Sequence, residues 1–449
     1  LVGVSVAAAL SLTGLGHAAL ADPPPATDSG TQSAATAAGT ATGIPLAVPL
    51  SATQKVADWQ SLQFGLFMHW GVYSTYEGMY QGRPQRMGYP EQIKAWEKIP
   101  DSDYKAQAAT MTADKWDAAN VCQTAKNTGM KYVMITTKHH DGFCLWDTAT
   151  TGFNAARRGP RRDLIRQLAD ATRAAGARFG VYFSGALDWH VSDFPPIQSD
   201  RELFLLRRND EAFARYAAAQ LIELIDRFEP SVLWNDIEWP DGGKGSDDFG
   251  VAALWRRYLS KVPDGVVNDR WGVPAHGHLT REYSDVEGVQ SKVWESTRGL
   301  GLSFGYNAEE DASHSLDATE LIRYFVDVVA KNGNLLINVG PRANGSVPEL
   351  QQQALDGLGA WLKINGAAVF GTRPWLRSGD GDVRYTHAKD TLYLHCLAPG
   401  AGELRLPAER AAAESVTWLG GGATPVRDGV AAIPERLRAQ PVAVAAVPG

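Results

Sequence analysis

Short apolar runs alternate with amphipathic stretches from about residue 52 to about residue 375. The runs are apolar along their whole length, which indicates strands buried on both faces, and the stretches have the spacing of α-helices. Alternation of this kind favours a parallel sheet. The predicted strands cover residues 65–69, 132–137, 179–183, 232–234, 265–268, 292–295 and 334–339. Predicted helices cover residues 163–175, 210–228, 319–331 and 348–365.

The number of strands decides between two parallel architectures. Seven clear strands over this length favour an eight-stranded (β/α)8-like (TIM-type) barrel with one irregular strand over an open doubly wound sheet. A nucleotide-binding doubly wound fold carries a Gly-rich fingerprint after its first strand, and none follows residues 65–69. We therefore predict an α/β chain whose barrel domain covers residues 51–375.

The pattern of apolar and polar residues changes after about residue 376. Short apolar runs at 391–397, 403–406 and 415–419 are separated by Gly, Pro and Asp turns, without a helical pattern until the end. This pattern is typical of antiparallel strands. Residues 376–449 are therefore predicted to form a small C-terminal β-sandwich.

The first fifty residues have the character of an export signal and a linker. Residues 2–16 are apolar and small, and Ala19-Leu20-Ala21 provides a cleavage site of the small-x-small type. Residues 22–50 are rich in Pro, Ala, Thr, Gly and Ser without periodicity, which predicts a disordered linker. We expect residues 1–21 to be a signal peptide and the protein to be secreted or periplasmic, with no membrane span.

Composition narrows the possible partners. The 449-residue chain has a net charge of −7, and its basic pairs Arg157-Arg158 and Arg161-Arg162 are too few for a nucleic-acid surface. Its 14 Trp residues suit a carbohydrate cleft, although Trp is also a good core residue. Cys122, Cys144 and Cys396 permit at most one disulfide, so stability must come from core packing.

The tripeptide Trp234-Asn235-Asp236 ends one apolar run with a carboxylate, and Pro240 prevents its continuation. Reactive side chains of parallel barrels lie where the strands end. Asp236 at such a position is either a buried nucleophile beside a flat Trp ring or the capping residue of the next loop. The segment alone leaves both interpretations open.

Polar residues follow several other predicted strands, as a barrel active site requires. Neighbouring strand residues point to opposite faces, so His139 and His140 can meet one ligand only if their strand ends there. The strand-end residues are His69, Lys138 to Asp141, Tyr182 to Ser184, and Asn268 to Arg270.

A metal site is one alternative for these side chains. His69, His139, His140 and Asp236 supply nitrogen and oxygen ligands of the type zinc accepts. No H-E-x-x-H motif or paired-carboxylate spacing accompanies them. Hydrogen bonding to sugar hydroxyls explains three histidines at strand ends better, so we predict no metal and no cofactor.

Several segments together closely resemble the glycoside hydrolase family 29 α-L-fucosidases. The resemblance runs in the same order from about residue 52 to residue 375, and the trailing β-domain fits the family architecture. The matching segments are FGLFMHWGVYS at 64–74, GMKYVMITTKHHDGF at 129–143, LWND at 233–236, NDRWG at 268–272, KVWE at 292–295, SFGYN at 303–307 and GNLLINVGP at 333–341.

The resemblance implies a retaining mechanism that uses two carboxyl groups. Asp236 matches the family's nucleophile. Glu282, in Thr280-Arg281-Glu282-Tyr283, is the best match for the acid/base, because it resembles a Thr-x-Glu-Tyr segment of the family. Glu295 is the alternative acid/base, since it also lies near the end of a predicted strand. Glu238 is expected to be a loop carboxylate.

The resemblance also implies a set of substrate-binding residues. Glu91 matches the Glu of a family Glu-Trp pair, whose Trp is replaced here by Gln92. Tyr306, or Phe304 beside it, is expected to pack on the C5 methyl group of fucose. The other matching positions are His69, His139, His140 and Arg270, which bind hydroxyls or the nucleophile, and the wall residues Tyr182 and Trp234.

These features predict a secreted retaining α-L-fucosidase that acts on fucosylated oligosaccharides or glycoconjugates. Two alternatives remain at this stage: a carbohydrate-binding protein without turnover, and a metal-dependent hydrolase that uses the histidines. Oligomeric state and linkage preference are not predicted, because loops outside the fucose pocket determine the latter.

Overall fold

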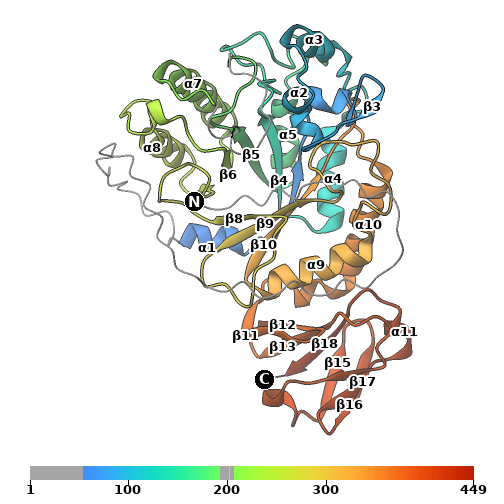
Figure 1. Cartoon of the computed structure of the whole chain (residues 1–449). Coiled ribbons are helices and arrows are strands. Elements are labelled where there is room, and N and C mark those ends of the chain that lie inside the picture. Colours follow the sequence, from blue (N-terminus) through green and yellow to red (C-terminus); the bar gives the residue numbers. More distant parts are fainter. Residues whose placement is uncertain (1–53, 193–201, 203–206, 449) are drawn as a thin grey trace.

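The computed structural model describes residues 54–192, 202 and 207–448, which form a barrel-like domain and a smaller β-domain (Figure 1). The expected signal peptide (1–21) and linker (22–50) lie outside the described residues. No helix within the described part of the chain is long and apolar enough to cross a membrane.

Eight strands of the larger domain form one sheet in the order β7-β6-β5-β4-β1-β10-β9-β8. Every neighbouring pair in this sheet is parallel. The predicted (β/α)8-like architecture is therefore confirmed. The strands are β1 (Phe64–Met68), β4 (Tyr132–Lys138), β5 (Arg178–Ser184), β6 (Val232–Asp236), β7 (Val266–Val267), β8 (Leu279–Glu282), β9 (Trp294–Gly299) and β10 (Gly333–Val339).

The two edge strands, β7 and β8, are consecutive in the chain. They share no ladder, but the backbone N–H groups of Gly277 and His278 donate to the Val267 carbonyl at 2.9 and 3.2 Å. These two bonds bridge the opening of the barrel. The irregular part of the barrel is thus the stretch that carries Arg270 and Glu282.

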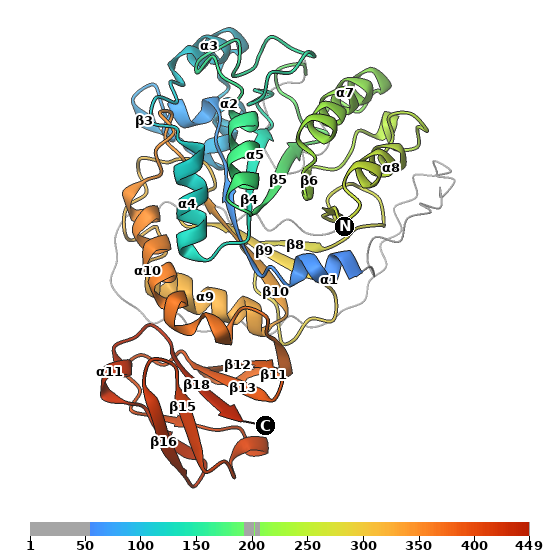
Figure 2. The same cartoon turned by 180° about the vertical axis from the view of Figure 1, so that it is seen from behind.

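Six helices cover the outside of the sheet (Figures 1 and 2). Three of the four predicted helices begin at an Asp side chain that accepts from the backbone of the first turn: Asp163, Asp210 and Asp317. The helices are α4 (Ala118–Thr128), α5 (Leu164–Ala174), α7 (Glu211–Phe228), α8 (Val251–Lys261), α9 (Ala318–Ala330) and α10 (Glu349–Asn365).

Strand alternation separates the barrel interior from the layer under the helices. Trp234 packs inside the barrel with Phe67 and Tyr182, whereas Leu233 belongs to the cluster that packs under the helices. Because side chains of a strand alternate in direction, Asp236 follows Trp234 toward the barrel axis. The pattern of β6 therefore directs this carboxylate to the mouth of the barrel.

Smaller elements lie at both ends of the barrel. At the N-terminal ends of the strands, α1 (Gln54–Gln60) places Trp59 against the rings of Tyr132 and His278. Elements that follow β1 include β2 (Met79–Tyr80), β3 (Arg83–Pro84), the 3-10 turn Pro90–Gln92, α2 (Ile93–Trp96) and α3 (Asp101–Gln107).

The C-terminal domain is an antiparallel arrangement of eight strands in the order β11-β12-β13-β18-β15-β16-β17-β14. It has its own apolar core, which includes Leu394 and Trp418. Its elements are β11 (Arg373–Asp380), β12 (Val383–Ala388), β13 (Thr391–Cys396), β14 (Glu403–Arg405), β15 (Ser415–Trp418), β16 (Gly422–Arg427), β17 (Val430–Ala432), α11 (Glu435–Arg438) and β18 (Ala443–Pro448).

This domain packs against α9 and α10 of the barrel (Figures 1 and 2). The Trp361 indole on α10 donates to the Val442 carbonyl at 2.9 Å, and Arg384 on β12 pairs with Asp327 on α9. The helices that bear these contacts lie on the flank of the barrel, so the C-terminal domain does not cover the carboxyl ends of the strands.

Two elements differ from the sequence expectations. The irregular strand β8 (Leu279–Glu282) was not among the predicted strands. The predicted strand at 292–295 is β9, which begins at Trp294 and extends to Gly299. Glu295 therefore lies at the start of its strand, and the expected strand-end position for it was wrong. The three cysteines are free and buried.

Candidate active site

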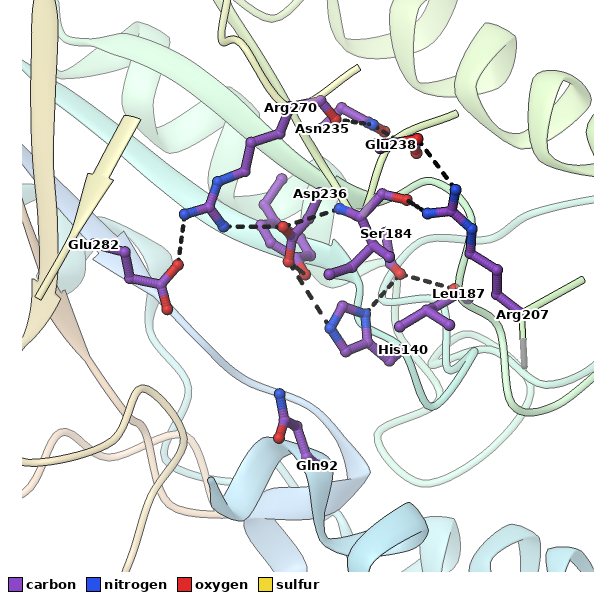
Figure 3. Close-up of polar contacts among 12 residues, drawn as sticks. Gln92, His140, Ser184, Leu187, Arg207, Asn235, Asp236, Glu238, Arg270 and Glu282 are labelled. Carbon is purple, nitrogen blue, oxygen red and sulfur yellow. Dashed lines mark hydrogen bonds and ion pairs between the residues drawn. The ribbon is translucent and has the colours of Figure 1, made fainter. Parts of the chain in front are cut away.

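The carboxyl ends of the central strands converge on a pocket that contains Asp236 (Figure 3). Asp236 is the last residue of β6, and Ser184, the last residue of β5, lies beside it in register. This position agrees with the rule that barrel active sites occupy the C-terminal face. Asp236 is not a helix cap, since no helix begins at the following residue.

Four groups surround the Asp236 carboxylate. Tyr182 O–H donates to Oδ2 at 2.8 Å, and His140 Nε2 lies 3.8 Å from the same oxygen. Arg270 Nη1 and the Ile237 backbone N–H both donate to Oδ1 at 3.0 Å. The carboxylate is thus held in a defined orientation by donors on both oxygens.

The surroundings of Asp236 keep it ionised although it is buried. Burial by itself raises the pKa of this carboxyl, but the charge of Arg270 and the hydrogen bonds from Tyr182 and Arg270 outweigh burial and lower the pKa overall. Burial and the neighbouring Asp236 raise the pKa of Tyr182 well above its ordinary value, so Tyr182 remains a donor. A buried carboxylate that stays ionised is available for nucleophilic attack.

Arg270 connects Asp236 to a second carboxylate. Its Nη2 donates to Glu282 Oε2 at 2.6 Å, while its Nη1 is bound to Asp236, and its guanidinium lies 4.9 Å from the centre of the Trp234 ring. Glu282 is the last residue of β8, on the far side of the barrel opening. The two carboxylates are therefore separated by one guanidinium group (Figure 3).

Glu295, the alternative acid/base, lies elsewhere. It is the second residue of β9 and is fully buried, so it lies near the N-terminal ends of the strands rather than at the mouth. Tyr132 O–H donates to its Oε2 at 2.7 Å, and His278 Nε2 lies 3.5 Å from Oε1. The structure does not bring Glu295 together with Asp236.

His139 and His140 share one side because β4 ends before them. The register between β4 and β5 shifts between Thr136 and Lys138, and the strand stops at Lys138. The two imidazole rings lie 4.0 Å apart, and His69 lies 5.6 Å from His139. The strand therefore ends before His139 and His140, which is the condition under which both side chains can meet one ligand.

Burial keeps the three histidines neutral. It lowers the pKa of His69 to about 3 and that of His140 to about 4, and it lowers the pKa of His139 well below its ordinary value. Neutral imidazoles both donate and accept, which suits sugar hydroxyls. His139 Nδ1 is buried and has no hydrogen-bond partner among the described residues.

The tautomer of His140 follows from its neighbour. Ser184 Oγ donates its proton to the Leu187 carbonyl at 2.7 Å, so it must accept from His140 Nδ1, also at 2.7 Å. His140 Nε2 then carries a lone pair toward the pocket. Sequence reasoning included Ser184 only as a strand-end residue and gave it no role.

Glu91 is buried at the edge of the pocket and accepts from the Gly305 backbone N–H at 2.8 Å. Burial raises its pKa to about 8 in spite of this hydrogen bond, so the carboxyl is protonated at neutral pH. The Trp96 indole donates to Gln92 Oε1 at 2.8 Å, which leaves the Gln92 amide nitrogen facing the pocket (Figure 3). Gln92 occupies the position of Trp in the family's Glu-Trp pair. Trp96, four residues later, therefore lies beside that position.

Phe304 and Tyr306 have different surroundings. Phe304 is buried and stacks on His69 with ring centroids 4.7 Å apart, which places it at the pocket wall. The Tyr306 phenol accepts from Arg342 at 3.3 Å, and the Arg342 guanidinium lies over its ring. Tyr306 therefore contacts Arg342, whereas Phe304 packs beside the histidines.

The chain turns sharply after Asp236. Ile237 and Glu238 both have positive φ values, 53° and 61°, which are uncommon for residues with a Cβ and cost on the order of 1–3 kcal/mol each. Asn235 Nδ2 donates to the carbonyls of Glu238 and Arg270 at 2.9 Å. Asn235 and Asn268 were not predicted as supporting residues, although both occur in the matching segments.

Within 54–192, 202 and 207–448, no group of three or more His, Cys, Asp or Glu side chains is arranged to hold a metal ion. The pocket consists instead of two carboxylates, one guanidinium, neutral imidazoles and aromatic rings. These groups can hydrogen-bond a polyhydroxylated ligand and support acid–base and nucleophilic chemistry.

A family model described as Alpha-L-fucosidase matches residues 45–367. A putative alpha-L-fucosidase of Caenorhabditis elegans is 32% identical over 361 residues, which cover 73% of this chain and 72% of that protein. The human plasma alpha-L-fucosidase is 30% identical over 411 residues, or 83% of this chain and 85% of that protein.

Solved structures agree with these relatives. The crystal structure of Thermotoga maritima alpha-fucosidase in complex with fucose superposes with a TM-score of 0.74 at 36% identity, covering 88% of this chain and 99% of that one. The alpha-L-fucosidase isoenzyme 1 from Paenibacillus thiaminolyticus gives a TM-score of 0.76 at 28% identity, covering 88% and 98%.

The neutral state of Glu91 generates a prediction about stability and pH. The folded pKa is about 8 and the ordinary value is 4.5, so between these values the folded chain holds a proton that the unfolded chain has lost. The contribution of Glu91 to the free energy of unfolding then falls as pH rises, by up to about 1.4 kcal/mol per pH unit. Glu91→Gln cannot ionise, so denaturant unfolding should show it gaining stability relative to wild type from pH 5 to pH 8.

Glu97→Gln is the control with the opposite sign. Burial raises the pKa of Glu97, but the hydrogen bonds from Arg83 and Arg86 outweigh burial and lower it overall. Its stabilisation is lost as pH falls, so Glu97→Gln should not gain stability as pH rises. A constant difference between Glu91→Gln and wild type across this range would contradict a protonated Glu91.

Proposed function

Because the chain belongs to the glycoside hydrolase family 29 α-L-fucosidases, we propose that it releases terminal α-L-fucosyl residues from oligosaccharides or glycoconjugates by a retaining, double-displacement mechanism. The observation that carries the mechanism is the buried, ionised Asp236 joined through Arg270 to Glu282. One carboxylate is ready to attack, and a second lies one guanidinium away.

In the first step, Asp236 attacks the anomeric carbon as the bond to the glycosidic oxygen breaks. Glu282 enters this step as a protonated carboxyl, gives its proton to the departing oxygen and is left as a carboxylate, while a fucosyl ester of Asp236 forms. In the second step, Glu282 removes a proton from water, the water oxygen attacks the anomeric carbon, and the Asp236 carboxylate leaves. Two inversions give overall retention of configuration.

Arg270 assists both halves of this cycle. While Asp236 is a free carboxylate, the guanidinium neutralises part of its charge and aligns Oδ1. Once Asp236 is an ester, Glu282 is the remaining carboxylate partner of Arg270, which suits its role as a base. The contact between the guanidinium and Trp234 fixes the plane in which both carboxylates are held.

Recognition of fucose follows from the neutral pocket. His69, His139 and His140 are proposed to bind ring hydroxyls, since each is buried and neutral. Phe304, which stacks on His69, is proposed to pack against the C5 methyl group. Glu91 as a protonated carboxyl can donate a hydrogen bond to the sugar at neutral pH.

We propose in addition that the protein is exported. The support is the sequence of the first 21 residues, with its apolar stretch and its Ala19-Leu20-Ala21 cleavage site. In the proposed mechanism the two carboxyl groups perform the chemistry, so no cofactor is needed. The exported protein could therefore hydrolyse fucosylated glycoconjugates outside the cytoplasm without one.

The first prediction for this function concerns Asp236→Gly. Loss of the nucleophile should lower turnover of an aryl α-L-fucoside by about 10³-fold or more. Azide fits the space left by the carboxylate and should restore part of the turnover, with release of β-L-fucosyl azide measured by NMR. Asp241→Gly, at an exposed position, is the control and should need no azide. Undiminished hydrolysis by Asp236→Gly would refute the assignment.

The second prediction separates Glu282 from Glu295. Glu282→Ala should slow fucosides with poor leaving groups far more than those with activated ones, because only poor leaving groups need protonation. Glu295→Ala should leave this dependence unchanged and lower the free energy of unfolding by about 1–3 kcal/mol, since it deprives Tyr132 of its partner. A steep leaving-group dependence in Glu295→Ala alone would reverse the assignment.

A further inference from the structure

We propose that Arg207 is a positioning residue for the nucleophile: it holds the left-handed turn at Ile237 and Glu238 that aims the Ile237 N–H at Asp236. The inference rests on the proposed function only in taking Asp236 as the attacking group. Arg207 does not contact Asp236 itself, and nothing in its sequence surroundings suggested a role.

The turn to be held is unfavourable by itself. Ile237 and Glu238 are consecutive residues with positive φ, and Ile237 is β-branched, which makes this conformation especially rare. The turn brings the Ile237 N–H onto Asp236 Oδ1 at 3.0 Å, the oxygen that also accepts from Arg270. Relaxation of the turn to ordinary φ values would remove this donor from the carboxylate.

Arg207 binds the turn from its outer side with two groups (Figure 3). Its Nη1 donates to the Ile237 carbonyl at 3.3 Å, and its Nη2 donates to Glu238 Oε2 at 3.1 Å. The guanidinium thus contacts both left-handed residues at once, one through its backbone and one through its side chain. The planar fork of Arg suits such a double contact, and the single ammonium group of Lys does not.

The Arg207 side chain is only 8% exposed, so the guanidinium is shielded from solvent, whereas the Glu238 side chain that it binds is 40% exposed. Lys244 binds the same Glu238 oxygen at 2.9 Å from the solvent side. Burial raises the pKa of Glu238, but Lys244 and Arg207 together lower it overall, so Glu238 is a carboxylate when it pairs with them.

The inner side of the turn is held separately. Asn235 Nδ2 bonds to the Glu238 carbonyl, and the Asn268 side chain bonds to the Asn235 backbone N–H and carbonyl at 3.0 and 2.8 Å. There is no room for the turn to collapse toward β5, since a Cβ on Gly185 would lie 2.1 Å from the Glu238 carbonyl oxygen. Arg207 restrains the turn against movement in the opposite direction, away from β5.

Loss of Arg207 should therefore let the turn relax outward and misalign Asp236 without changing the sugar-binding groups. A misplacement of about 1 Å in a reacting group costs on the order of 10²-fold in rate. We expect Arg207→Gln to lower kcat on an aryl α-L-fucoside by about 10- to 100-fold, with the Kd for fucose unchanged within twofold. Arg207→Lys should recover part of the loss, because one of the two bonds can form.

The azide reaction distinguishes positioning from general damage. In Asp236→Gly the nucleophile is external azide, so it does not depend on the turn that aims a carboxylate. Arg207→Gln added to Asp236→Gly should leave the azide-rescued rate within about twofold. Arg257→Gln, which removes a surface pair with Asp226, is the matched control and should change neither rate.

Three results would overturn the inference. One is an unchanged kcat in Arg207→Gln, and another is a parallel fall of the azide-rescued rate. If Arg207→Gln does not fold, Glu238→Gln keeps the length of the side chain and weakens the same contact, so it should also lower kcat; wild-type kcat in that variant is the third result. Absence of any azide rescue in Asp236→Gly alone would count against the proposed function instead.

Discussion

The guanidinium of Arg270 lies between Asp236 and Glu282, and the geometry of the pocket depends on that one charge. The residue stands on the connection between β7 and β8, where the barrel is bridged by only two backbone hydrogen bonds. Glu282 comes from the short strand on one side of this opening, and Asp236 from β6 on the other. Arg270 thus joins the two carboxyl groups of the proposed mechanism across the least regular part of the barrel.

Burial around this charge gives each neighbouring group its state. The low polarity of the barrel mouth keeps His69, His139 and His140 neutral and Glu91 protonated, while Asp236 stays ionised because Arg270 compensates it. One carboxylate, the proposed nucleophile, is therefore surrounded by groups that can donate to or accept from hydroxyls. The sharp turn after Asp236 is unfavourable because Ile237 and Glu238 have positive φ values, and Asn235 and Arg207 hold it from two sides.

Much of this arrangement could be predicted from the sequence, because buried parallel strands are continuous apolar runs and the residues that end them are polar. Asp236, Arg270 and the histidines were found in this way. β8 was missed because Leu279–Glu282 is short and only partly buried. Glu295 was misplaced because β9 continues to Gly299, beyond the predicted end of that strand at residue 295. Contacts such as that of Arg207 with Ile237 join segments 30 residues apart and leave no periodic signal.

The central claim is that Asp236 becomes covalently attached to the sugar. The direct measurement is to inactivate the enzyme with 2-deoxy-2-fluoro-α-L-fucosyl fluoride, in which fluorine slows the second step, and to locate the label by peptide mass spectrometry. The account predicts one fucosyl adduct per chain, on the peptide that contains Asp236, and recovery of activity as the ester hydrolyses. A label on Glu282 or Glu295, or turnover without any covalent adduct, would contradict it.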